Sequence, residues 1–132
     1  MEQPDAIKRC TNNGGRIDDN ISVKLGGLEQ NKYRLLECEH ILLLGCGTSY
    51  HSSLWSQEIF KSLDIFSTVH VFDGAEFNIT DIPKKGKTCI ILCSQSGETK
   101  DLHRCIHIAK EYDLPTIGVV NVVDSLIARD TD

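Results

Sequence analysis

Two short segments, both rich in glycine and in hydroxyl side chains, carry the residue types best suited to ligand chemistry in this sequence. They are Gly45-Cys46-Gly47-Thr48-Ser49 and Ser94-Gln95-Ser96-Gly97-Glu98-Thr99. Hydroxyl groups donate hydrogen bonds to an oxyanion without adding formal charge, and glycine allows close approach of the backbone because it has no Cβ. The two segments together predict a binding site for an anionic, phosphate-bearing ligand.

A purely structural role competes with this prediction. Serine is favoured at the N-cap of a helix, so Ser96 could be only a cap and Thr99 a first-turn residue. For a single segment of this kind, a binding role and a purely structural role are about equally probable. Two such segments at neighbouring strand ends favour a site, because ligands of open α/β sheets lie outside the carboxyl ends of the strands.

A second alternative is a nicotinamide dinucleotide-binding domain. Gly45-Cys46-Gly47 would begin its glycine-rich fingerprint, and Asp73 would be the acid that binds the ribose. However, Tyr50 occupies the position of the third glycine, where close packing of helix on strand leaves no room for a side chain. The fingerprint is incomplete, and it leaves the second hydroxyl-rich segment without a role.

The elements that must position these segments alternate between strand and helix. Apolar runs predict strands at 41–44, 69–72, 88–93 and 115–120. Helices are expected at about 49–63 and 99–112, where apolar residues recur at helical spacing; in the first helix they are Trp55, Ile59, Phe60 and Leu63. This order predicts an α/β fold, a three-layer α/β/α sandwich on a parallel sheet, with 41–44 and 88–93 central and adjacent.

Composition narrows the class of partner. The chain has 132 residues and a formal net charge of −5, which argues against a nucleic-acid surface. No apolar run reaches the roughly 18 residues of a membrane span. Six cysteines without a C-x-x-C pair suit free thiols in the cytoplasm. His103 and His107 share a helical face, but Cys105 does not lie on it and no third ligand is evident, so a solvated face is favoured over a metal site. Neither a metal nor a cofactor is expected.

In combination, the motifs resemble the sugar isomerase (SIS) domain, and specifically the first of the two such subdomains in the glutamine-fructose-6-phosphate aminotransferase (glucosamine-6-phosphate synthase) family. Cys46-Gly47-Thr48-Ser49-Tyr50 and Ser94-Gln95-Ser96-Gly97-Glu98-Thr99 look like the two signature loops of that family. Gly15-Arg16-Ile17, Leu25-Gly26-Gly27-Leu28 and Ala75-Glu76-Phe77 resemble it in the same order. The resemblance covers nearly the whole chain.

This resemblance implies a flavodoxin-like sheet and a site for fructose 6-phosphate, as part of amino sugar (UDP-N-acetylglucosamine) biosynthesis. The residues expected at the site are Cys46, Gly47, Thr48, Ser49, Ser94, Gln95, Ser96, Gly97 and Thr99, with the second loop holding most of the phosphate. The expected partners are a phosphorylated hexose and either a second copy of the chain or the remaining synthase domains.

Departures from the family limit the expected chemistry. Glu2 stands where the family has its glutaminase nucleophile, and the sequence stops at Asp132, before the last strand of this subdomain and the whole second subdomain. A missing edge strand and an inactive isolated chain are therefore expected. We expect an N-terminal arm at 1–39 packed on a sugar-phosphate-binding domain at 40–132. A stand-alone, non-catalytic sugar-phosphate sensor or interaction module is the alternative.

Overall fold

The computed structural model describes residues 2–18 and 22–132 of the chain, which divide into two compact units at residues 32 and 33. The first unit contains α1 (Gln3–Cys10), a short antiparallel pair of β1 (Ile17–Asp18) and β2 (Ser22–Val23), and α2 (Gly26–Gln30). A turn with positive φ at Asn12, Asn13 and Gly14 follows α1. These residues reverse the direction of the chain between α1 and β1.

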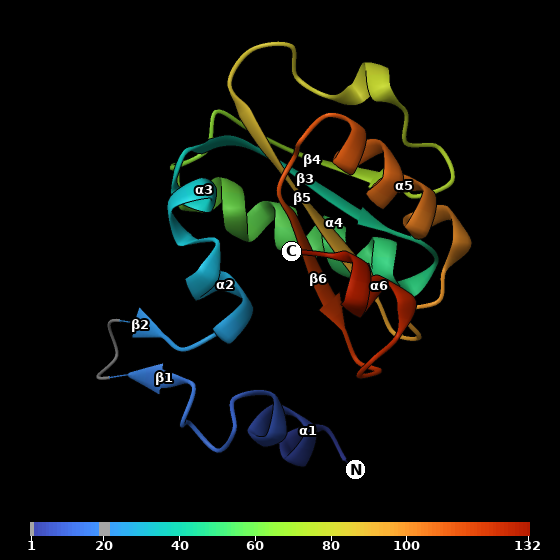
Figure 1. Cartoon of the computed structure of the whole chain (residues 1–132). Helices are drawn as coiled ribbons and strands as arrows, with labels where there is room; N and C mark the ends of the chain where they lie inside the picture. Colours follow the sequence, from blue (N-terminus) through green and yellow to red (C-terminus); the bar gives the residue numbers. More distant parts are fainter. Residues whose placement is uncertain (1, 19–21) are drawn as a thin grey trace. The chain divides into compact units, whose positions relative to one another are not determined.

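The second unit contains a four-stranded parallel sheet with the order β4-β3-β5-β6 (Figure 1). Its strands are β3 (Cys38–Gly45), β4 (Thr68–Asp73), β5 (Lys87–Ser94) and β6 (Thr116–Val120). Its helices are α3 (Lys32–Leu36), which spans the division, α4 (Thr48–Ser62), the 3₁₀ turn η1 (Ile79–Asp81), α5 (Lys100–Glu111) and α6 (Leu126–Asp130). The predicted α/β class and parallel sheet are confirmed.

The two strands expected at the centre of the sheet do lie side by side. Ile41 is opposite Cys89 and Gly45 is opposite Cys93, so β3 and β5 reach their carboxyl ends at the same level. Counting only the strands of this sheet, the order is 2-1-3-4, which corresponds to the flavodoxin-like arrangement. The chain leaves β3 toward β4 on one side and returns to β5 on the other.

Apolar side chains of the sheet point alternately to two cores, as the period of a strand requires. Leu42, Leu44, Ile90 and Leu92 face a core completed by α5, by Phe77 and by Ile127 of α6. The residues between them on β3 and β5 face a second core with Phe60 of α4. Figure 1 shows α5 and α6 on one side of the sheet and α4 on the other, which gives the three layers.

Helix α4 forms where it was expected but buries a different face. The apolar residues Trp55, Ile59 and Leu63, whose spacing predicted the helix, are exposed, and Trp55 is 71% exposed. Ser53 is fully buried instead. Small side chains bring this helix close to the sheet, which a stripe of larger residues would prevent. The spacing identified the helix, but of its four apolar residues only Phe60 packs against a core.

Other differences concern the ends of elements. The strands extend one to three residues beyond several predicted ends, because a central strand can continue through polar residues such as Lys87 and Ser94. Before the sheet, Asn31 separates the short helices α2 and α3, and Cys38 begins β3. Among the described helices, none is both long and apolar enough to cross a membrane.

Candidate functional site

The two hydroxyl-rich loops leave the carboxyl ends of the two central strands. Residues 46–49 follow β3 and residues 95–99 follow β5, and these strands are hydrogen-bonded neighbours. Because the connections from β3 and β5 run to opposite sides, this end of the sheet is a topological switch point, where open α/β sheets leave a crevice for ligands. The predicted site residues thus emerge at one edge, each loop running into the first turn of a helix.

The first loop depends on close backbone packing. A Cβ on Gly45 would lie 2.7 Å from the carbonyl carbon of Ser49 and from the backbone nitrogen of Tyr50, so only glycine fits beneath the first turn of α4. Gly47 precedes that helix with a positive φ of 57°. Thr48 and Ser49 are its first two residues; Thr48 is exposed and Ser49 is half-buried.

The second loop is held together by its own hydroxyl groups. Ser94, only 6% exposed, accepts a hydrogen bond from the backbone N–H of Gly97 at 3.0 Å, and its Oγ lies 3.2 Å from Oγ1 of Thr99. Ser96 Oγ accepts from the N–H of Glu98 at 3.2 Å. Gly97 is buried with a positive φ of 68°. These contacts turn the loop sharply before α5 begins.

Some residues of the second loop are buried and hold its shape, whereas others are exposed to solvent. Ser94 and Gly97 are buried, whereas Gln95 and Ser96 are exposed and Thr99 is half-buried. The first N–H groups of α5 lack partners within that helix, as in any helix, and the helix begins directly after this loop. The arrangement can donate several hydrogen bonds to one oxyanion, aided by the positive end of the helix dipole.

The structure corrects the alternative role considered for Ser96. Thr99, not Ser96, is the N-cap residue of α5, and Lys100 begins the helix. The Thr99 side chain makes no capping hydrogen bond and contacts Ser94 instead. Ser96 therefore shapes a turn within the loop, three residues before the N-cap position.

Asp73, the ribose-binding acid of the dinucleotide alternative, has a hydrogen-bond partner two residues later in the chain. Asp73 ends β4, and its Oδ1 accepts a hydrogen bond from the N–H of Ala75 at 2.9 Å, which stabilises the turn after the strand. Tyr50 lies in the first turn of α4, where its backbone nitrogen already packs against Gly45. Both positions have structural roles in the sheet-to-helix connections.

The thiol at the start of the first loop is not an activated nucleophile. Burial raises the pKa of Cys46, and the neighbouring carboxylate of Asp73 raises it further. A thiol needs a lowered pKa to be a thiolate near neutral pH. Burial also raises the pKa of Cys105 to about 11 and that of Cys89 to about 12. These cysteines act as small apolar residues.

One histidine side chain of α5 contacts α6. His103 Nε2 is 2.5 Å from Oδ2 of Asp130, and the rings of His103 and His107 meet edge to face at 4.8 Å. Cys105 is buried on another face and donates to the Asp101 carbonyl. In the part of the chain that the structure describes, three or more His, Cys, Asp or Glu side chains nowhere form a group that could hold a metal ion.

Residues 125–127 contact the second loop and are not among the residues predicted for the site. The N–H of Ile127 donates to the carbonyl of Gly97 at 3.0 Å, and the N–H of Leu126 donates to Oε1 of Glu98 at 3.0 Å. Ser125, which precedes α6, packs against Gly97. A serine before the apolar pair Leu126-Ile127 is typical of a helix start, and this signal could have revealed α6.

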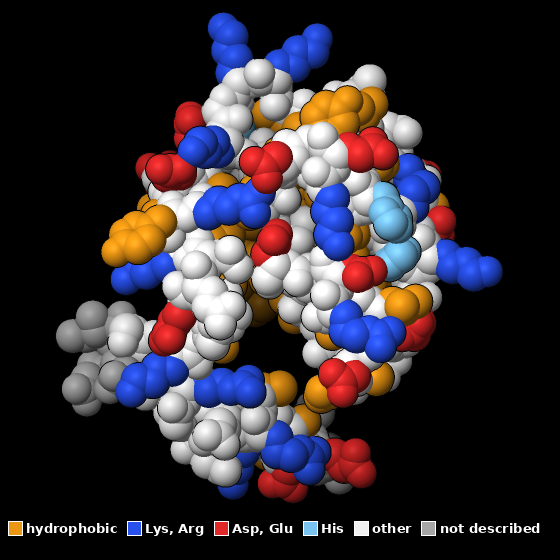
Figure 2. Space-filling view, viewed as in Figure 1, with side chains coloured by type: hydrophobic (Ala, Val, Ile, Leu, Met, Phe, Trp, Pro, Cys, Tyr) orange, Lys and Arg blue, Asp and Glu red, His pale blue; other side chains and the backbone are white. Residues whose placement is uncertain are grey.

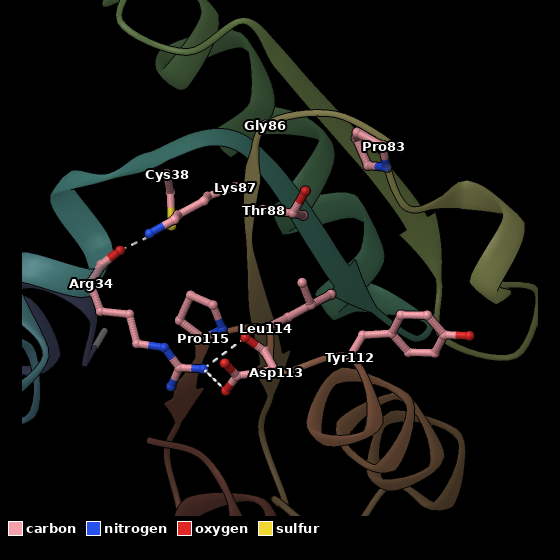
Figure 3. Close-up of a pocket in the computed structure, with 10 residues that line it drawn as sticks. All are labelled: Arg34, Cys38, Pro83, Gly86, Lys87, Thr88, Tyr112, Asp113, Leu114 and Pro115. Carbon is pink, nitrogen blue, oxygen red and sulfur yellow. Dashed lines mark hydrogen bonds and ion pairs between the residues drawn. The ribbon is translucent and has the colours of Figure 1, made fainter.

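A cavity of about 230 Å³ lies at the opposite end of the sheet from the loops. Its wall includes Cys38, which begins β3, and Lys87, which begins β5, so it is at the amino ends of the strands. Arg34 in this wall donates to the backbone carbonyl and to Oδ1 of Asp113 (Figure 3), and Lys87 pairs with Glu37. The charges of this cavity are thus paired within the protein.

Charged side chains of both signs are interspersed over the face that carries α5 and α6 (Figure 2). With a net charge of −5, an anion bound by this chain would gain little from the overall field. Attraction must come from local donors. The loops at the switch point carry such donors, because hydroxyl side chains and the start of a helix follow each of the two strands.

Comparison with known proteins identifies the family. Residues 34–132 match the SIS domain. A protein of Acanthamoeba polyphaga mimivirus named "Probable glutamine–fructose-6-phosphate aminotransferase (isomerizing)" is 51% identical over 104 residues, which are 79% of this chain and 17% of that protein. Rat glutamine–fructose-6-phosphate aminotransferase (isomerizing) 1 is 32% identical over 133 residues, 100% of this chain and 19% of that enzyme. The chain thus spans about a fifth of the length of these relatives.

Solved structures support the fold. The C-terminal domain of the Francisella tularensis glucosamine-fructose-6-phosphate aminotransferase superposes with a TM-score of 0.79 at 24% identity, covering 99% of this chain and 36% of that one. The sugar isomerase domain of the RpiR transcription factor from Sphaerobacter thermophilus superposes with a TM-score of 0.66 at 18% identity, covering 100% of this chain and 73% of that one. From the family match and the shared fold, the chain belongs to the SIS domain family.

Proposed function

We propose that this chain binds a phosphorylated hexose, fructose 6-phosphate, through the loops at 46–49 and 94–99. The observation that carries the proposal is the second loop. Its buried Ser94 and Gly97 fix a turn that leaves Gln95 and Ser96 exposed beside the first turn of α5. A phosphate at that place would accept hydrogen bonds from several donors at once.

The two loops would divide the ligand between them. The second loop presents its donors from a turn that hydrogen bonds already hold, so it suits the phosphate, whose position must be fixed. The first loop presents the exposed Thr48 and the half-buried Ser49, and Cys46 and Gly47 bring the chain to them. These hydroxyls would orient the sugar.

The relatives support this choice of ligand. The curated relatives bear the name of an isomerizing glutamine–fructose-6-phosphate aminotransferase, and the matched domain is a sugar isomerase domain. By this proposal, the chain supplies a substrate-binding part of the isomerase domain in amino sugar biosynthesis, and acts in the cytoplasm. The proposal is supported by the sheet, which brings both loops to the carboxyl ends of two neighbouring strands.

Calorimetric titration of the chain with fructose 6-phosphate and with fructose tests the proposal. We expect clear preference for the phosphorylated sugar. Ser96→Ala should weaken fructose 6-phosphate binding by about tenfold or more, because a hydrogen bond to a charged group contributes about 1.5–3 kcal/mol and about 1.4 kcal/mol corresponds to a factor of ten. Its affinity for fructose should not change.

A matched control is Ser62→Ala, at the far end of α4, where the hydroxyl donates to the Ile59 carbonyl. This variant should bind like the parent, and circular dichroism should show that both variants are folded. Equal affinity of the parent for the two sugars would refute the proposal. A titration with NADH, if it showed binding instead, would favour the dinucleotide alternative.

A further inference from the structure

The second loop is joined to a segment almost thirty residues later in the chain. Ile127 N–H donates to the Gly97 carbonyl, and Leu126 N–H donates to the Glu98 carboxylate, each at 3.0 Å. These two bonds involve consecutive residues on both sides. They therefore fix the position and the direction of the loop, not only one atom of it.

Glu98 is an unexpected residue in a loop that binds an anion. A carboxylate close to a phosphate would repel it, and this repulsion is strongest where water is excluded. In this structure the Glu98 carboxylate accepts a hydrogen bond from the backbone of Leu126. Its side chain thus has a partner outside the loop, and its role is explained by that partner and not by the ligand.

Ser125 also contacts the second loop, at Gly97. Its side chain is 3% exposed, and among the described residues its Oγ has no hydrogen-bond partner. The Oγ occupies the space next to Gly97: a Cβ built on that glycine would lie 1.9 Å from it. Ser125 therefore fills the place that any side chain at position 97 would need, and it packs the positive-φ turn tightly.

The segment that holds the loop is itself anchored. Ile127 is fully buried in the core between the sheet and α5. At the end of α6, Asp130 Oδ2 lies 2.5 Å from His103 Nε2 on α5. Because α6 is attached to the core and to α5, it can act as a fixed support for the loop.

We propose that Glu98 and Ser125 are positioning residues of the phosphosugar site, which hold the second loop on residues 125–127 in the conformation that binds phosphate. This inference rests on the proposed function. Glu98 acts through its hydrogen bond to Leu126, so the acceptor oxygen matters and the negative charge does not. A neutral residue that keeps the acceptor should therefore replace it.

The experiment compares Glu98→Ala, which removes the acceptor, with Glu98→Gln, which keeps an acceptor oxygen and removes the charge. Glu111→Ala at the end of α5 is the matched control for loss of a carboxylate. We expect Glu98→Ala to weaken fructose 6-phosphate binding at least fivefold. Glu98→Gln should bind within twofold of the parent or more tightly, and Glu111→Ala should bind like the parent.

Hydrogen exchange of the Leu126 amide, measured by NMR without ligand, gives a second readout. Exchange should accelerate in Glu98→Ala and stay near the parent rate in Glu98→Gln. If both variants weaken binding equally, or if Leu126 exchanges equally in all forms, the positioning role is refuted. A parent that shows no preference for fructose 6-phosphate over fructose overturns the proposed function itself, whereas the exchange rates still report whether Glu98 holds the loop.

Discussion

The loop after β3 and the loop after β5 begin at the same level of the sheet but keep their shapes by different means. In the first, Gly45 lets the backbone of α4 approach to a distance that no Cβ would allow. In the second, Ser94 bonds to Gly97 and Thr99 within the loop, and residues 125–127 support it from outside. Close backbone packing holds the first loop, and side-chain hydrogen bonds hold the second.

This difference bears on how each loop would meet a ligand. Donors that are fixed before binding lose little conformational freedom when the ligand arrives, which favours affinity. The second loop meets this condition, because its hydroxyls are already in contact with its backbone. In the first loop the exposed Thr48 lies on the surface of a helix. We therefore expect substitutions in the second loop to have larger effects on phosphate binding.

The largest expected effect is that of Gly97→Ala. The positive φ of 68° disfavours any Cβ, and the new Cβ would lie 1.9 Å from Ser125 Oγ and 2.7 Å from Cγ1 of Val120. Left-handed backbone costs about 1–2 kcal/mol for a non-glycine residue and overpacking about 1–3 kcal/mol, so we expect a loss of about 2–5 kcal/mol in unfolding free energy. Urea unfolding followed by circular dichroism measures it.

The double variant Gly97→Ala with Ser125→Gly separates the two causes. It removes the nearest atoms but keeps the positive φ and the contact with Val120. Part of the lost stability should return relative to Gly97→Ala alone. No recovery would mean that contact with Ser125 does not limit position 97.

A smaller loss of stability is expected for Gly45→Ala. Its φ is not in the positive range, so the cost comes from crowding against the backbone of Ser49 and Tyr50, about 1–3 kcal/mol. Gly47→Ala is the informative comparison. A Cβ there meets nothing within 4 Å, but the φ of 57° is unfavourable.

The two variants should differ in how far they disturb α4. Gly45→Ala should displace α4 and weaken the α4 contact with the sheet, whereas Gly47→Ala should leave that contact intact and disturb only the turn. Near-ultraviolet circular dichroism, which reports on Trp55 and the tyrosine of α4, should change in the first variant more than in the second. The reverse order would show that backbone packing at Gly45 does not hold the first loop.

The sequence predicted most of the fold because strand periodicity and loop composition are local signals. The apolar runs at 41–44 and 88–93 were long enough to identify central strands, and the glycine and hydroxyl residues after them identified the loops. The orientation of α4 could not be read in this way. The stripe with Trp55 has helical spacing, but which face meets the sheet depends on the close approach that Ser53 and Gly45 allow.

The contacts between residues 125–127 and the second loop could not be predicted either, but for a different reason. Leu126 and Ile127 meet Gly97 and Glu98 only because β6 and α6 return the chain to that end of the sheet. No spacing within the sequence encodes such a contact. Likewise, the composition of the second loop suggested that its hydroxyls were alike, whereas the structure buries Ser94 and exposes Ser96.

The smallest expected effect is that of Thr48→Val, which keeps the shape of the side chain and removes its hydroxyl. Thr48 is exposed in the first turn of α4, and we assign it to the sugar and not to the phosphate. A hydrogen bond between neutral groups contributes about 0.5–1.5 kcal/mol, at the low end when both partners remain hydrated. The affinity for fructose 6-phosphate should therefore fall by about two- to fivefold, less than for Ser96→Ala. Affinity for unphosphorylated fructose should fall by the same factor, because the lost bond does not involve the phosphate. Thr80→Val in the exposed 3₁₀ turn η1 is the matched control and should bind like the parent. Parallel calorimetric titrations with both sugars measure these ratios. If Thr48→Val weakens fructose 6-phosphate binding as much as Ser96→Ala and leaves fructose binding unchanged, then the first loop also holds the phosphate, and the division between a sugar-orienting loop and a phosphate-holding loop is wrong.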